Sequence, residues 1–122
     1  MTRAQAEIWL AEQASATGRQ VCGAFVLFFR KGASYARLYS IAVLPSAQGQ
    51  GVGAALMEQA EARARAKGLH ELRQEVRANN HSLINRHLGR GYRPYGQTAN
   101  YYPDGSPCLK LTKDLNKEPG HE

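Results

Sequence analysis

The stretch QGQGVG, residues 48–53, follows a strongly apolar segment and precedes an alanine-rich one. Three glycines at alternate positions cost backbone entropy and pack almost no side-chain surface. That cost is offset where the chain must adopt positive φ or where a bulky ligand must approach the bare backbone. The stretch therefore predicts either a binding turn or a flexible glycine-rich loop.

The residues after this stretch carry a helical period. The apolar positions of residues 52–67 recur at helical spacing, basic residues fill the last turn, and Gly68 is expected to end the helix. A helix N-terminus presents unpaired N–H groups and a partial positive charge. A phosphate group on the glycine turn is therefore the favoured reading.

Two strands are expected before the glycines, at residues 21–30 and 35–44, because both segments are rich in β-branched and aromatic residues. A third strand is expected at residues 69–76. Strict alternation along the second strand would place Leu38, Ser40 and Ala42 on one face and Tyr39, Ile41 and Val43 on the other.

The remaining segments complete an α/β (α+β) domain. Residues 7–12 fit a short strand or a helix end, residues 79–91 a short helix opened by Asn79 or Asn80, residues 92–107 turns, and residues 108–115 a last strand. The expected order is strand, strand, helix, strand, helix, strand, strand, which gives a mixed sheet with helices packed on it. We expect one domain over residues 1–115 and a flexible tail over residues 116–122.

Composition limits the class of protein. The 122 residues are 43% hydrophobic, enough for one domain with a core, and no segment approaches the roughly 20 apolar residues of a membrane span. Cys22 and Cys108 are expected to be buried thiols in a reducing compartment, so the cytoplasm is predicted, with no membrane association. The net charge of +6 favours an anionic partner, but the basic residues are dispersed, so no nucleic-acid partner is expected. The histidines lack metal-ligand spacing, so no metal is expected.

Two other phosphate motifs fit poorly. Gly49-x-Gly51-x-x-Ala54 matches the dinucleotide fingerprint formally, but a loop separates it from the strand and the chain is short for the paired halves of that fold. A P-loop is excluded because no Gly-Lys-Ser/Thr follows the glycines.

The arrangement resembles the GNAT superfamily of acetyl-CoA-dependent N-acetyltransferases. Its signature Gln/Arg-x-x-Gly-x-Gly/Ala matches residues 48–53, and the likeness extends over residues 7–115. The stretch NYYPDG, residues 100–105, is similar to the branch that acetylates N-terminal alanines of ribosomal proteins. The resemblance implies a largely antiparallel twisted sheet, in which the first strand and helices of the family are largely missing here.

The resemblance also implies a binding site for acetyl-CoA as the acetyl donor. The diphosphate would lie on the glycine loop, and the pantetheine arm would pair with the end of the central strand like an added strand. An asparagine that opens the second helix would contact the same arm. The residues at these positions are Ile41, Ala42, Val43, Gln48, Gly49, Gln50, Gly51, Val52, Gly53, Ala54 and Asn80.

Two positions match catalytic residues of that family. Glu75 falls at the general base, although a solvated strand face would explain it equally well. His87 stands where the family has a tyrosine acid. It would protonate the departing thiolate, act as a bystander to water or a nearby tyrosine, or mark weakened activity.

The expected acceptor is an amine-bearing small molecule or a protein N-terminus. Tyr101, Tyr102 and Asp104 would lie near it in this branch, or would form a tyrosine-rich turn packed on the sheet. Loss of the family's first helices would expose apolar sheet surface, so a homo-oligomer is expected. The alternatives are a non-catalytic acyl-CoA-binding protein and, less favoured, a basic nucleic-acid-binding module.

Overall fold

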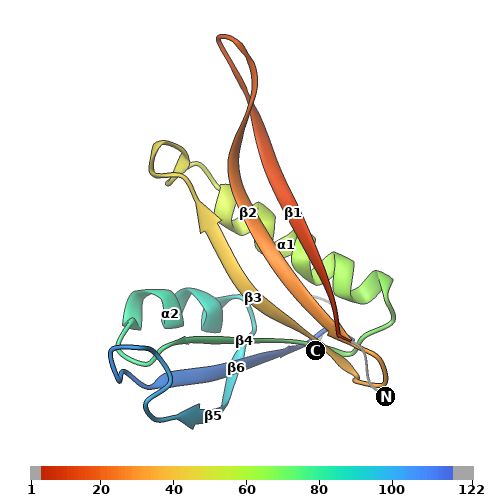
Figure 1. The fold of residues 1–122 in the computed structure, drawn as a ribbon, viewed down its shortest axis with the longest axis vertical. Helices are drawn as coiled ribbons and strands as arrows, with labels where there is room; N and C mark the ends of the chain where they lie inside the picture. Colours follow the sequence, from red (N-terminus) through yellow and green to blue (C-terminus); the bar gives the residue numbers. More distant parts are fainter. Residues whose placement is uncertain (1–3, 117–122) are drawn as a thin grey trace.

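The computed structural model describes residues 4–116, and the tail expected beyond Asn116 lies outside the described residues. The described chain forms one six-stranded sheet in the order β1-β2-β3-β4-β6-β5. β3 and β4 are parallel, and every other neighbouring pair is antiparallel, which confirms the mixed, largely antiparallel sheet. In chain order the elements are β1 (Ala4–Ser15), β2 (Gly18–Arg30), β3 (Tyr35–Val43), the 3-10 turn η1 (Pro45–Ala47), α1 (Val52–Ala66), β4 (Glu71–Arg77), α2 (His81–Gly89), β5 (Arg93–Thr98) and β6 (Cys108–Asp114) (Figure 1).

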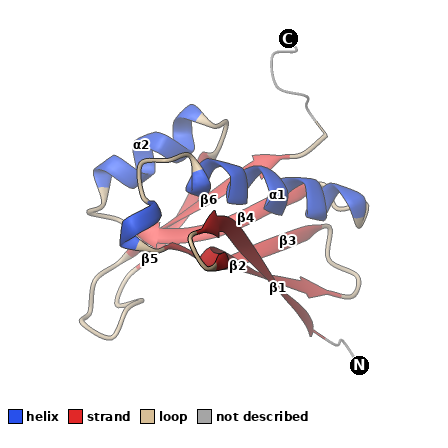
Figure 2. Cartoon of the chain, turned by 90° about the horizontal axis from the view of Figure 1, so that it is seen from above, coloured by secondary structure: helices blue, strands red, loops and turns tan. Residues whose placement is uncertain are grey.

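Both helices lie on the same side of the sheet (Figure 2). The buried face of α1 packs on Phe25, Leu27 and Leu72, and Ile84 of α2 belongs to the same core. The free thiols Cys22 and Cys108 are buried, as predicted. The opposite face of the sheet carries exposed side chains, among them Ile8 and Leu10 of β1, whose exposed fractions are 70% and 60%.

The structure has one strand more than the expected order, and the first of the two strands expected after the second helix lies in a stretch that was expected to be turns. β1 is 12 residues long, whereas the sequence suggested only a short strand or a helix end at residues 7–12. Three strands therefore precede α1 rather than two. Its pairing with β2 and the stacking of Trp9 on Phe25, with ring centroids 6.0 Å apart, stabilise a segment of weak local propensity. β5 lies inside the stretch expected to be turns, because Pro94 and Gly96 obscure its strand character; it is an edge strand, where such residues are tolerated.

The predicted faces of β3 are wrong beyond Leu38. Val26 pairs with Ser40 and Leu27 with Leu38, so Tyr39 is an extra residue in β3. A one-residue bulge reverses the alternation that follows it. Ile41 and Val43 therefore pack against the core beside Leu38, whereas Ser40 and Ala42 are exposed.

A buried carboxylate ties α1 to the far edge of the sheet. Glu61 is 4% exposed. It accepts hydrogen bonds from Tyr92 Oη at 2.9 Å and Lys113 Nζ at 2.8 Å. Burial and the neighbouring carboxylate raise the pKa of Tyr92, which keeps the hydroxyl protonated as a donor.

The central opening of the fold lies between β3 and β4. These strands pair only from Tyr35–Leu38 to Glu71–Gln74, and no pairing between them is present beyond those residues in the described chain. Figure 1 shows β3 rising away from β4 past this point. The N-terminus of α1 follows the separated end of β3, and α2 follows the separated end of β4.

Candidate active site

The glycine turn has the conformation that its composition predicted. Gly49 and Gly51 adopt φ of +80° and +83°, and Gly51 is the N-cap of α1. The amides of residues 52–54 form no hydrogen bond to another described residue. A Cβ added at Gly49 or Gly51 would meet nothing within 4 Å. The helix tip therefore presents free N–H groups to open space, which fits an anionic ligand.

A groove of about 560 Å³ runs from this turn to α2. One wall is the end of β3, residues 41–43, with the glycine turn and Met57 of α1; the other is Leu83 and Arg86 of α2 with Arg90, the C-cap of that helix. Residues 41–43 pair with β2 along one edge and have no partner strand on the β4 side among the described residues. Apart from the Val43 carbonyl, which accepts from Gln48, the N–H and C=O groups on that side can pair with an extended, amide-bearing ligand.

The predicted cofactor residues divide into three sets. Seven line this groove: Ile41, Ala42, Val43, Gly49, Gly51, Gly53 and Ala54. The side chains of Gln48 and Gln50 brace the loop instead, donating to the carbonyls of Val43 and Ser46, both at 3.2 Å. Val52 packs toward the core beside β2, so only its backbone faces the turn, and the Asn80 side chain caps α2 by accepting from the Leu83 amide.

A second cavity of about 270 Å³ lies in the opening between β3 and β4. It shares the lining residues Ile41, Leu83 and His87 with the groove, so the two cavities are adjacent, and together they form the cleft. Glu75 and Asn80 also line it. The residues predicted for donor binding and those predicted for catalysis are thus brought together.

Glu75 is held by two residues that the sequence reading did not connect to it. Its Oε1 accepts from Arg37 Nε at 2.9 Å, from Arg37 Nη2 at 2.6 Å and from Tyr101 Oη at 3.1 Å. Burial and the Glu75 carboxylate raise the pKa of Tyr101, which keeps its hydroxyl a donor. No hydrogen bond from a described residue reaches Oε2. One carboxylate oxygen is fixed and the other is free.

His87 is buried in the wall between the two cavities, with 4% of its surface exposed. Its Nδ1 lies 3.2 Å from Nε2 of Gln74, and its ring meets Tyr92 edge-on. Burial, followed by the positive charges of Arg86 and Arg90, lowers the pKa of His87 below its usual value. The ring is therefore neutral at pH 7 and offers an N–H donor rather than an imidazolium acid.

The sequence reading missed Arg86 and Arg90. Their spacing of four residues on one helix, on the face shared with Leu83 and His87, was a signal that could have found them. Nε of Arg90 is buried without a hydrogen-bond partner in the described chain, and its guanidinium lies 3.8 Å from Glu61. Arg37 and Tyr101 gave no such signal, because 38 and 26 residues separate them from Glu75.

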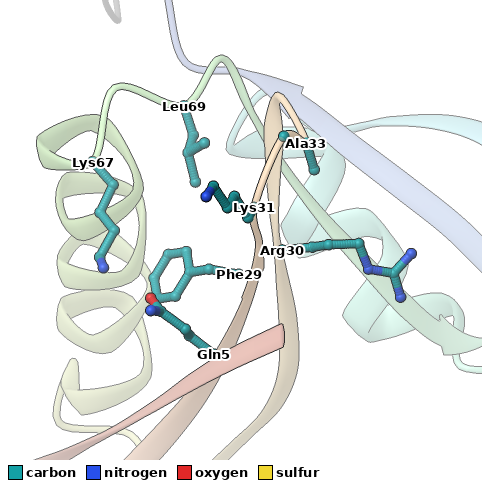
Figure 3. Close-up of a pocket in the computed structure, with 8 residues that line it drawn as sticks. Gln5, Phe29, Arg30, Lys31, Ala33, Lys67 and Leu69 are labelled. Carbon is teal, nitrogen blue, oxygen red and sulfur yellow. The ribbon is translucent and has the colours of Figure 1, made fainter. Parts of the chain in front are cut away.

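A further cavity of about 520 Å³ lies at the opposite end of α1, about 22 Å from the glycine turn by the length of the helix. Figure 3 shows Gln5, Phe29 and Lys67 facing this space while Arg30 points away from it. The ammonium of Lys67 lies 4.7 Å from the Phe29 ring centroid. Its lining residues include neither a carboxylate nor a histidine, so it offers neither of these side chains as a general base.

Residues 4–116 contain no cluster of three or more His, Cys, Asp or Glu side chains that is arranged to hold a metal ion. No helix in the same residues is long and apolar enough to span a membrane.

Known proteins match this geometry. The family model described as the acetyltransferase (GNAT) family matches residues 2–92. The ribosomal-protein-S18-alanine N-acetyltransferase of Escherichia coli is 27% identical with a TM-score of 0.70, over 84% of this chain and 66% of that one. Ard1 of Thermoplasma volcanium is 27% identical with a TM-score of 0.72, over 78% and 64%. The chain thus spans about two thirds of the length of these two proteins.

A GNAT family acetyltransferase of Elizabethkingia anophelis, solved with acetyl-CoA bound, shares the fold with a TM-score of 0.79 at 19% identity, over 89% of this chain and 76% of that one. No curated protein sequence matches the chain. On the family match and the shared fold, the chain belongs to the acetyltransferase (GNAT) family and is an N-acetyltransferase that uses acetyl-CoA as its donor.

Proposed function

We propose that the protein transfers the acetyl group to a primary amine, such as a protein N-terminus, by direct attack while donor and acceptor occupy the cleft together. The observation that carries this proposal is the adjacency of the two cavities, which share Ile41, Leu83 and His87 as lining residues. The glycine turn binds the donor in the groove, and Glu75 lies in the adjacent cavity. Bound acetyl-CoA supplies an activated thioester carbonyl.

Binding of the donor rests on backbone groups and two cations. The amides of residues 52–54 are free to donate to a diphosphate, and Arg86 and Arg90 face the same groove from α2. The unpaired Nε of Arg90 gains an acceptor when an anion binds beside it. The free edge of β3 aligns the amide-bearing arm of the donor.

Glu75 is the proposed general base. Arg37 and Tyr101 fix Oε1, which leaves Oε2 to accept the proton of the incoming amine directly or through a water. An α-amino group, with a pKa near 8, loses its proton far more readily than a lysine side chain, with a pKa near 10.4. This difference favours an N-terminal amine over lysine as the acceptor.

The backbone of β3 and the ring of His87 act on the other side of the reaction. A free N–H of residues 41–43 is placed to donate to negative charge that develops on the acetyl oxygen. His87 is neutral and lines both cavities. Its N–H donates a hydrogen bond to the departing sulfur, and a water protonates the thiolate. We propose this role in place of the imidazolium acid expected from the sequence.

The test is thiol release from acetyl-CoA with a panel of peptides, small amines and polyamines. A Glu75→Gln variant should lower kcat about 100-fold or more and leave acetyl-CoA affinity unchanged in calorimetry. Glu71→Gln, on the same face of β4, is the matched control and should keep kcat. Tight acetyl-CoA binding without turnover in the wild-type protein would instead establish a non-catalytic acyl-CoA-binding protein.

A further inference from the structure

The cavity of about 270 Å³ that contains Glu75, called the acceptor cavity below, holds a second charged side chain that the proposed reaction does not use. Arg77 lies two residues after Glu75 on β4, so both project from the same face about 7 Å apart. Both line the cavity. The Glu75 side chain is 12% exposed and that of Arg77 is 43% exposed, which places the carboxylate inside and the guanidinium toward the mouth.

The environment of Arg77 leaves it able to bind a ligand. Its guanidinium lies over the ring of Tyr102, 4.2 Å from the centroid, which holds the planar group in a defined orientation. It makes one described hydrogen bond, from Nη1 to Oδ2 of Asp104 at 2.9 Å. Asp104 belongs to an exposed turn, and ion pairs at exposed sites are weak. An incoming carboxylate can replace Asp104 and accept two parallel bonds from the fork.

The neighbouring arginines are used differently. Arg37 makes three hydrogen bonds to Glu75 and Tyr101, so it is engaged in holding the carboxylate. Arg73 pairs with Glu71 at 3.1 Å and lies over Tyr35, 3.9 Å from its centroid, but does not line the cavity. Among these three arginines, Arg77 alone lines the acceptor cavity and has guanidinium N–H groups that make no described hydrogen bond.

We propose that Arg77 is a specificity-determining residue that selects acceptors carrying a carboxylate close to the reacting amine. The amine binds at Glu75 and the carboxylate at Arg77. Glu75 is the one carboxylate in the described lining of this cavity, so a polyamine finds no partner there for its second positive charge. The inference rests on the proposed function, since it assumes that the acceptor amine reacts at Glu75.

Two sources of the carboxylate are separable by experiment. Amidated peptides that begin Ala-Glu, Ala-Gln and Ala-Lys vary the side chain of the second residue. Free alanine and alaninamide vary the α-carboxylate alone. For the wild-type protein we expect kcat/KM at least tenfold higher for the acidic member of one of these sets, mainly through KM; which set responds identifies the source.

Variants of Arg77 complete the test. Arg77→Gln should remove the preference, and Arg77→Glu should reverse it toward Ala-Lys, with the KM for acetyl-CoA unchanged in both. Arg73→Gln, which removes an equivalent arginine from the same face outside the cavity, should keep the wild-type preference. Thermal unfolding of all three confirms that they are folded.

The failures are distinguishable. Equal rates for acidic and neutral acceptors in the wild-type protein, or a preference that survives in Arg77→Gln, would overturn this inference and leave the proposed acetyl transfer standing. Absence of transfer to every acceptor would overturn the proposed function and this inference with it.

Discussion

The two halves of the cleft are lined by different chemical groups. The donor half, around the glycine turn and the end of β3, offers mainly backbone N–H and C=O groups, with Arg86 and Arg90 opposite. The acceptor half, around Glu75, is built from charged and aromatic side chains held in pairs, such as Glu75 with Arg37 and Arg77 with Asp104. Under the proposed function, backbone groups of the donor half thus bind a constant ligand, and exchangeable side chains of the acceptor half discriminate among acceptors.

The largest effect is expected from a substitution that places a charged side chain in the donor half and leaves the fold intact. Gly53 is helical, and a Cβ there would meet only Val43, at 3.8 Å, so Gly53→Glu fits sterically. Its carboxylate would enter the groove and repel the diphosphate. We expect at least a 100-fold loss of acetyl-CoA affinity in calorimetry. Ala55→Glu adds the same charge on the far side of α1 and should change affinity less than threefold; an equal loss in both variants would contradict the placement of the phosphates.

The next prediction distinguishes the contribution of side chains to acetyl-CoA binding in the donor half from that of the backbone. Arg86→Gln removes one cation that faces the groove, so acetyl-CoA affinity should fall about tenfold, roughly 1.4 kcal/mol. Affinity measured between low and high salt should also depend less on ionic strength than in the wild-type protein. Arg93→Gln, on β5 away from the groove, serves as control. Identical salt dependence in Arg86→Gln and wild type would show that Arg86 does not contribute to binding of the anion.

A smaller effect concerns His87 at the junction of the halves. Because its folded pKa is lowered, the unfolded chain binds the proton more tightly, and stability falls as pH drops below about 6.5. One such group changes the free energy of unfolding by at most about 1.4 kcal/mol per pH unit. Denaturant unfolding at pH 7.5, 6.5 and 5.5 should show this decline. It should shrink in His87→Gln and persist in His81→Gln, whose histidine is exposed.

The smallest effect on the site is expected from substitutions on the solvent-exposed face of β1. Ile8 and Leu10 project from it, exposed to 70% and 60%, so we expect self-association through this face. The double change Ile8→Ser with Leu10→Ser should lower the mass seen in sedimentation velocity and leave acetyl-CoA affinity intact. Leu88→Ser, on α2, is the control. A wild-type protein that stays monomeric at high concentration would refute this expectation.

The conformation of the glycine turn and the helices beside it could be predicted from sequence because their determinants are local. The glycine spacing, the helical period of residues 52–67 and the Asn80 N-cap each lie within one short segment. The bulge at Tyr39 could not be predicted, because it appears only in the pairing of β3 with β2. The partners of Glu75 are contributed by β3 and by the turn before β6, and the burial of Glu61 depends on Lys113 of β6; long-range packing decides both.

Amide spectra of ¹⁵N-labelled protein titrated with coenzyme A test the central claim most directly. The account predicts the largest shifts at residues 49–54 and 41–43, together with slowed amide exchange at residues 52–54, and little change at Lys31 and Lys67 in the cavity of Figure 3. The largest shifts at that distant cavity, with unchanged amides at the glycine turn, would contradict it.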